Sequence, residues 1–174
     1  VSVKLASEGA KVVVNYFENE SEANETVKLI ENSGGEAIAV YADATNLEDI
    51  SNLVKATTAA FGAKVDVLVN VAGGLFARKT IDAVDVDFYN LLMDVNFKSA
   101  VFVTQAFKPL MGKGASVINF ASQAARDGGG PGASLYAASK GAVMTFTRAM
   151  AKEFGPDGIR VNALCPGMIA TKFH

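Results

Sequence analysis

A tyrosine and a lysine stand four residues apart in the segment "YAASK", which runs from Tyr136 to Lys140. Residues four apart lie on the same face of a helix, so the ammonium of Lys140 can sit beside the phenol of Tyr136. A free phenol has a pKa of about 10, and acid–base work near neutral pH requires that pKa to fall by up to roughly 3 units. A neighbouring cation supplies part of that fall. The pair is therefore either an acid–base group or part of an exposed amphipathic helix face.

Further polar or turn-forming residues follow stretches that have the pattern of β-strands. Asp43, Asn70, Ser122 and Pro166 each come at the end of such a stretch. Ligands of open α/β sheets bind beyond the carboxyl ends of the strands, so one crevice is expected to hold all four. Each also has a purely structural interpretation: Ser122 could cap a turn, and Asp43 could begin the next helix. Asn96, inside a helical stretch, could hydrogen-bond locally.

Short runs of β-branched and other apolar residues alternate with longer segments of helical spacing, which predicts an α/β protein with a parallel sheet. The nearly continuous apolar character of the short runs is typical of strands buried on both faces. Strands are predicted at residues 11–16, 36–41, 65–70, 115–121 and 159–164. Helices are predicted from a Ser21 cap to Gly34–Gly35, from an Asn46 cap to Gly62, and over 87–112 and 134–154.

Composition excludes several classes of protein. The chain has 174 residues, half of them hydrophobic, and is expected to form one globular domain over 1–174. Its net charge of −2, without a basic run, argues against a nucleic-acid partner. No apolar stretch has the roughly 18 residues of a spanning helix, and a cytoplasmic location is expected. With one cysteine, Cys165, and one histidine, His174, no internal disulfide, no cysteine-based zinc cluster and no Ser-His-Asp triad is expected.

Six motifs occur in a fixed order along the chain. They are "DA" (Asp43 and Ala44), "NVAG" (Asn70 to Gly73), "MDVN" ending at Asn96, "NFAS" ending at Ser122, "YAASK", and "NALCPGMIAT" ending at Thr171. Any one of them is a weak signal, whereas the order and spacing of all six resemble the short-chain dehydrogenase/reductase family. The resemblance implies a doubly wound, Rossmann-like parallel sheet and a dinucleotide cofactor, NADP or NAD.

The resemblance also implies roles for individual residues. Tyr136 would exchange a proton with the substrate oxygen, and Lys140 would lower the pKa of Tyr136 and hold the nicotinamide ribose. Ser122 would hydrogen-bond the carbonyl, and Asn96 would anchor a water relay to Lys140. No metal site is expected. The cofactor contacts that the resemblance implies are Tyr16, Asp43, Ala44, Asn70, Ala72, Gly73, Tyr136, Lys140, Pro166, Gly167, Ile169 and Thr171.

The sequence departs from the family pattern in identifiable places. Family members begin with a strand and a TGxxxGxG turn that receives the pyrophosphate, and they continue beyond "PGMIAT". The opening "VSVKLASEGA" resembles the end of the helix after that turn, so we expect a partial domain without the family's central first strand and its last strand. Val71 replaces the usual second asparagine of "NNAG". The glycine-rich run "RDGGGPGA" is expected to leave the loop before Tyr136 mobile until a ligand binds.

These features lead to a functional hypothesis with alternatives. Tyr16 stands where members that prefer NAD carry an acidic residue, which modestly favours NADP. The expected reaction moves a hydride between NAD(P)H and a ketone or secondary alcohol, as in 3-oxoacyl-carrier-protein reductases. The alternatives are a sugar or polyol dehydrogenase of the same family, and a non-catalytic binding or oligomerisation fragment. The apolar helical segments at 87–112 and 134–154 are expected to form the interface of a homo-oligomer, a dimer or tetramer.

Overall fold

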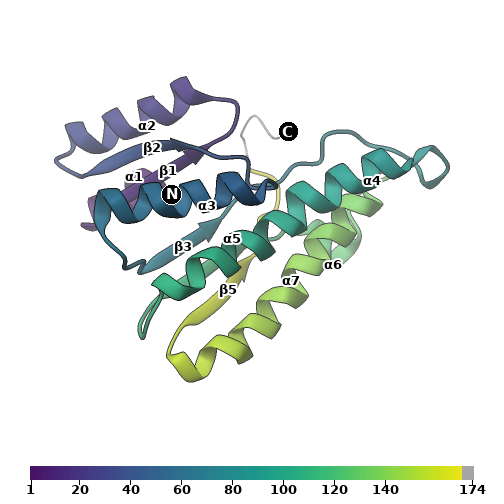
Figure 1. Cartoon of the computed structure of the whole chain (residues 1–174). Coiled ribbons are helices and arrows are strands. Elements are labelled where there is room, and N and C mark those ends of the chain that lie inside the picture. Colours follow the sequence, from purple (N-terminus) through teal and green to yellow (C-terminus); the bar gives the residue numbers. More distant parts are fainter. Residues whose placement is uncertain (170–174) are drawn as a thin grey trace. The chain divides into compact units, whose positions relative to one another are not determined.

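The computed structural model describes residues 1–169 (Figure 1). The chain divides into two compact units. Unit 1 comprises residues 1–64, and unit 2 begins at residue 65. All the strand pairs within both units are parallel, as the apolar runs indicated. The organisation of residues 1–174 as a single domain stays a prediction.

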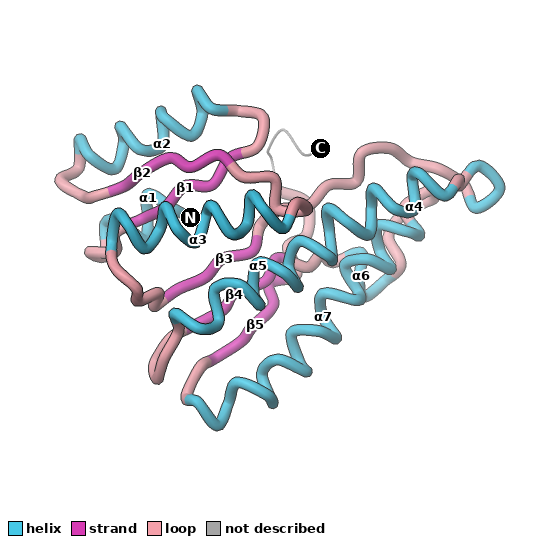
Figure 2. The backbone as a smooth tube through the Cα atoms, viewed as in Figure 1, coloured by secondary structure: helices cyan, strands magenta, loops and turns pink. Residues whose placement is uncertain are grey.

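Unit 1 contains a two-stranded sheet with β1 (Val12–Tyr16) beside β2 (Ala37–Tyr41) (Figure 2). The register pairs Val12 with Ala37 and continues to Tyr16 opposite Tyr41. The helices of this unit are α1 (Ser2–Ser7), α2 (Glu20–Asn32) and α3 (Leu47–Phe61). Ala6 of α1 and Ile30 of α2 pack with residues of both strands in a small apolar core.

The sequence located one helix cap in unit 1 correctly and one incorrectly. The Asn46 side chain accepts hydrogen bonds from the backbone N–H groups of Glu48 and Asp49, and α3 ends at Gly62, as expected. Ser21, expected to cap α2, lies inside the helix, which begins at Glu20 after Asn19. The earlier start places Glu20 and Glu22 in the first turn, where their negative charge stabilises the helix dipole.

Unit 2 contains a three-stranded sheet in the order β3 (Val67–Asn70), β4 (Ser116–Phe120) and β5 (Arg160–Leu164). In this sheet α5 (Ser99–Phe107) packs against β3, and α7 (Ser134–Phe154) packs against β4 and β5. The remaining elements are η1 (Ile81–Ala83), α4 (Val86–Met93), η2 (Asp94–Lys98), η3 (Lys108–Leu110), α6 (Ala124–Asp127) and η4 (Gly155–Asp157). None of the helices within residues 1–169 has both the length and the apolar character needed to cross a membrane.

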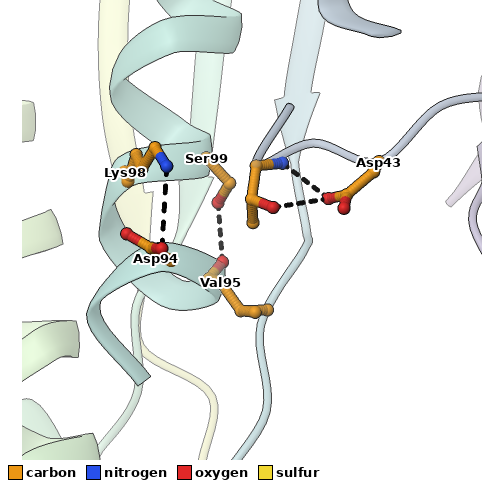
Figure 3. Close-up of polar contacts among 6 residues, drawn as sticks. Asp43, Asp94, Val95, Lys98 and Ser99 are labelled. Carbon is orange, nitrogen blue, oxygen red and sulfur yellow. Dashed lines mark hydrogen bonds and ion pairs between the residues drawn. The ribbon is translucent and has the colours of Figure 1, made fainter. Parts of the chain in front are cut away.

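The helical segment expected over 87–112 is interrupted by a wide, π-helical turn, η2. The side chain of Asn96 donates a hydrogen bond to the Leu92 carbonyl at 3.0 Å and thereby occupies an acceptor of the preceding turn. On the same turn, Ser99 donates to the Val95 carbonyl and Lys98 lies near Asp94 (Figure 3). Single π-helical turns inside α-helices occur frequently at functional sites.

Buried polar side chains connect the sheet of unit 2 to both of its long helices. Asn70 and Asn119 are register partners on β3 and β4, and Nδ2 of Asn70 donates to Oδ1 of Asn119 at 2.8 Å. Asn70 also donates to Oγ1 of Thr104 on α5. Nδ2 of Asn119, which is fully buried, donates to Oγ1 of Thr147 on α7 at 2.9 Å. These bonds fix the positions of α5 and α7 on the strands whose ends carry the predicted site.

Replacing Asn119 tests this network. Asn119→Ala leaves Asn70 without one acceptor and Thr147 without one donor in a buried environment. Each buried unsatisfied group costs roughly 1–3 kcal/mol, so the loss of two partners should lower the free energy of unfolding by about 2–6 kcal/mol. Urea denaturation measures the change, and Asn52→Ala, at an exposed position of α3, is the control. Equal losses for the two variants would contradict the stabilising role of the network.

Candidate active site

Unit 2 contains a cavity of about 680 Å³ at the carboxyl ends of its strands. Its walls come from the segments that follow β3, β4 and β5 and from the start of α7. Seven of the residues expected at the site line this cavity, namely Gly73, Ser122, Tyr136, Lys140, Pro166, Gly167 and Ile169. The structure therefore brings together the expected acid–base pair, the expected hydroxyl donor and the "PGMI" segment.

Tyr136 and Lys140 lie in the first two turns of α7, and both are buried. Tyr136 is 8% exposed and Lys140 is 4% exposed. The interpretation of this pair as an exposed amphipathic helix face is therefore wrong. Lysine is almost never fully buried without a reason, because an ammonium loses hydration in the interior.

Among residues 1–169, the Lys140 ammonium donates a hydrogen bond to the Phe120 carbonyl, at 2.8 Å from Nζ. Burial lowers the pKa of Lys140 from 10.5 to about 8, so the group remains mostly charged at pH 7. An ammonium has three N–H donors, and Lys140 borders the cavity. Its remaining donor capacity fits a ligand with hydroxyl groups, as the ribose of a nicotinamide cofactor has.

Asn96 clamps the loop that follows β3 rather than lining the cavity. Its Oδ1 accepts a hydrogen bond from the Gly74 N–H at 2.9 Å, and its Nδ2 donates to the Gly74 carbonyl at 2.9 Å. A Cβ atom on Gly73 would lie 2.6 Å from both Asn96 Oδ1 and Lys140 Nζ. Only glycine leaves room for these two groups to approach the same point. The water relay expected at Asn96 stays a prediction.

Ser122 caps a turn and also borders the cavity, and its hydrogen bond to a substrate carbonyl stays a prediction. Its Oγ accepts a hydrogen bond from the backbone N–H of Ala124 at 3.2 Å, which caps the turn into α6. The same side chain borders the cavity. A serine hydroxyl has one donor in addition to its acceptor lone pairs, so capping leaves the proton of Ser122 available for a ligand oxygen.

Two of the expected cofactor residues use their side chains for internal bonds. The Asn70 amide belongs to the buried network with Thr104 and Asn119. The Asp43 carboxylate accepts hydrogen bonds from N and Oγ1 of Thr45, each at 2.8 Å (Figure 3). The backbone of Asn70, rather than its side chain, is therefore the part that can contact a cofactor. Ala44 is half-buried in the turn after Asp43, Ala72 is exposed after β3, and Thr171 lies outside the described residues.

Tyr16 lies at the end of β1 and borders a second cavity of about 410 Å³, within unit 1. Partial desolvation and, next, the Glu20 carboxylate raise the pKa of the Tyr16 phenol. Glu18 and Glu22 also line this cavity, and its described lining includes no lysine or arginine. The described lining of this cavity therefore places two carboxylates near Tyr16.

Sequence reasoning missed one wall of the cavity in unit 2. The missed lining residues are Val71, Leu75, Arg78, Phe120, Ala121, Gln123, Ala124, Asp127, Gly129, Gly130, Ala133 and Met168. Arg78 donates to the Pro131 carbonyl at 3.1 Å, and the Lys79 N–H donates to the Gly132 carbonyl at 3.1 Å. The glycine-rich run was noticed in the sequence, but nothing in its pattern identified Arg78 as its partner.

Comparisons with known proteins agree with this arrangement. The family model described as "Enoyl-(Acyl carrier protein) reductase" matches residues 1–174. A 3-oxoacyl-[acyl-carrier-protein] reductase of Synechocystis is 39% identical over 173 residues, which cover 98% of this chain and 68% of the relative. The crystal structure of a dehydrogenase/reductase from Sinorhizobium meliloti has a TM-score of 0.95 at 33% identity, covering 99% of this chain and 69% of that one. The chain thus spans about two thirds of the length of these relatives.

Two similar solved structures contain nicotinamide cofactors. A short-chain dehydrogenase from Burkholderia cenocepacia, in complex with NADP, has a TM-score of 0.92 at 32% identity and covers 99% and 71% of the two chains. The NADH-dependent reductase A1-R′, complexed with NAD, has a TM-score of 0.90 at 34% identity and covers 97% and 73%. The chain belongs to the short-chain dehydrogenase/reductase family of NAD(P)-dependent oxidoreductases, and its fold is Rossmann-like.

The buried charge of Lys140 predicts a pH-dependent stability. The folded pKa is about 8 against 10.5 for ordinary lysine, so between these values the unfolded chain binds more protons. The free energy of unfolding therefore rises as the pH increases from about 8 toward 10.5. The stability gained over this range is lost again as the pH falls through 8. Lys140→Met removes the cost of burying a charged ammonium, and wild type pays this cost at pH 7 but largely escapes it at pH 10. The stability advantage of Lys140→Met over wild type should therefore shrink by about 2–3 kcal/mol between pH 7 and pH 10.

Urea unfolding at the two pH values measures this difference. Lys152→Met, at an exposed position of the same helix, is the matched control and reports the background titration of other groups. The interpretation fails if Lys140→Met and Lys152→Met change the pH dependence equally.

Proposed function

We propose that this chain is the catalytic part of an enzyme that transfers a hydride between NAD(P)H and a ketone or secondary alcohol. The observation that carries the proposal is the burial of Tyr136 and Lys140 at the wall of the cavity that Ser122 also borders. Membership in a family of NAD(P)-dependent oxidoreductases supports the same reaction.

The residues around the cavity fit a nicotinamide cofactor. Lys140 can donate to ribose hydroxyls, Gly73 lets the backbone approach closely, and the Pro166–Gly167 segment borders the same space. When bound, the cofactor supplies or accepts the hydride, and the protein supplies orientation and electrostatics.

Proton transfer falls to the side chains of this chain. In the direction of reduction, Tyr136 donates its hydroxyl proton to the carbonyl oxygen, and the Ser122 hydroxyl donates a hydrogen bond to the same oxygen. Asn96 acts as a positioning residue, because it fixes the Gly73–Gly74 loop against Lys140.

Removing the proton donor tests the proposal. Tyr136→Phe keeps the ring and its packing but loses the hydroxyl, so kcat/KM for carbonyl reduction should fall by roughly 10²–10⁴-fold while the Kd of the cofactor changes only a few-fold. Tyr89→Phe, on the exposed side of α4, is the matched control and should leave both constants unchanged. A Tyr136→Phe variant that retains turnover within tenfold of wild type would remove Tyr136 from the mechanism.

The substrate class within this reaction is the finer part of the proposal. The similarity to a 3-oxoacyl-[acyl-carrier-protein] reductase supports reduction of a 3-oxoacyl group, with a sugar or polyol as the alternative. A non-catalytic binding or oligomerisation role is the outcome if no carbonyl compound is reduced. The homo-oligomer expected from the helices stays a prediction.

The cofactor preference depends on the negative cavity beside Tyr16. Tyr16 itself does not repel a 2′-phosphate, whereas Glu18 and Glu22 in the same lining do. We infer that these two carboxylates weaken the NADP preference that Tyr16 favours.

The double variant Glu18→Gln, Glu22→Gln should therefore raise the ratio of kcat/KM for NADPH to kcat/KM for NADH. Each charge contributes on the order of 1 kcal/mol at short range in a solvated site, so an increase of about fivefold or more is expected. Glu25→Gln, on α2 outside the cavity lining, is the control and should leave the ratio unchanged. An unchanged ratio in the double variant would mean that these carboxylates do not face the ribose.

A further inference from the structure

Arg78 is a charged residue of the cavity in unit 2 that the proposed reaction does not use. It lies in the segment after β3, and its Nη1 donates one hydrogen bond, to the Pro131 carbonyl. A guanidinium has five N–H donors. Within residues 1–169, Arg78 forms no ion pair with a carboxylate.

The glycine-rich loop between Ser122 and Tyr136 is fitted closely around this arginine. A Cβ atom on Gly132 would lie 2.9 Å from the Cβ of Arg78, and one on Gly130 would lie 3.4 Å from its Nη1. The hydrogen bond from the Lys79 N–H to the Gly132 carbonyl holds the two segments together. A side chain at Gly132 would clash with the Cβ and backbone of Arg78, so glycine at this position allows Arg78 to lie at the cavity wall.

The other charged groups near this wall already have partners or a role. Lys79 forms an ion pair with Asp85 at 2.6 Å. The carboxylate of Asp127, which also lines the cavity, accepts the Gly129 N–H at 2.9 Å, and this bond and the Gln123 side chain lower the pKa of Asp127. Lys140, the other lining cation, lies beside Tyr136 on α7. Lys140 has a proposed role toward the cofactor, so Arg78 is the lining cation that the proposed reaction leaves for a group of the substrate.

The rest of the lining is mostly apolar, with Leu75, Phe120 and Met168 among its members. A ligand anion entering such a cavity needs a cation, and a guanidinium binds carboxylate and phosphate oxygens through paired hydrogen bonds. We propose that the carbonyl substrate carries an anionic group, a carboxylate or phosphate, and that Arg78 binds this group and determines substrate specificity. This inference rests on the proposed function and adds the charge of the substrate.

Pairs of ketones that differ in charge test the inference directly. The probes are 3-oxobutanoate and 4-oxopentanoate with their methyl esters, and dihydroxyacetone phosphate with dihydroxyacetone. Wild type should show a kcat/KM at least tenfold higher for the charged member of at least one pair. The carboxylate and phosphate pairs identify which anion is bound.

Substitution of Arg78 should then remove the preference. Arg78→Gln should lower kcat/KM for the charged substrate at least tenfold, mainly through KM, and leave the uncharged partner within twofold. Arg78→Lys keeps the positive charge but loses the planar guanidinium. Its kcat/KM for the charged substrate should lie between those of wild type and Arg78→Gln. Arg126→Gln, at an exposed arginine of α6 outside the lining, is the control and should retain the wild-type preference.

Each contrary outcome has a distinct meaning. Equal loss for charged and uncharged partners, or a wild type that prefers the uncharged partners, overturns the inference and leaves the proposed function intact. A tenfold weaker cofactor Kd in Arg78→Gln, measured by calorimetry, would assign the anion to the cofactor and also overturn it. If wild type reduces none of the six probes, the proposed function fails for ketones of this size, and the inference fails with it.

Discussion

The geometry of the site depends on the burial of one ammonium group, that of Lys140. Burial lowers its pKa to about 8, which corresponds to a cost of about 3 kcal/mol for keeping the charge at neutral pH. The compensation visible in the structure is one hydrogen bond to the Phe120 carbonyl, at the end of β4. A cost of this size has to be offset by the remaining packing of α7 on the sheet. A buried charge that costs this much is more consistent with a functional role than with a contribution to stability.

The groups around Lys140 are arranged by close backbone approach rather than by side-chain contacts alone. Gly73 leaves the space in which Asn96 and Lys140 come near the same point, and Asn96 holds Gly74 through both its N–H and its carbonyl. The wide turn η2 presents the Asn96 side chain from inside a helix. The glycine-rich loop between Ser122 and Tyr136 is arranged in the same way, because Gly132 leaves room for Arg78. Glycines after β3 and before α7 therefore determine how tightly the walls of the cavity can close.

The sequence predicted the regular elements well because their signals are local. The five strands differ from the expected ranges by at most two residues at either end, and α7 spans Ser134–Phe154 as expected. The roles expected of Tyr136 and Lys140 came from the resemblance of six motifs to a family, because helical spacing alone favoured an exposed helix face. Their burial is a finding of the structure. The π-helical turn at Asn96 and the contact between Arg78 and Pro131 could not be predicted, because each depends on residues distant in sequence or on one side chain that competes with the helix backbone.

The polar residues at the strand ends show why a structural role does not argue against a functional one. Ser122 caps a turn through its lone pairs and keeps its proton, whereas Asn70 commits its amide to Thr104 and Asn119. The first arrangement leaves the side chain able to bind a ligand, and the second leaves only the backbone. The Asn70 network in turn fixes α7 on β4 through Thr147, and α7 carries Tyr136 and Lys140. The Asn70 side chain therefore helps to fix the position of α7, which carries the candidate acid–base pair.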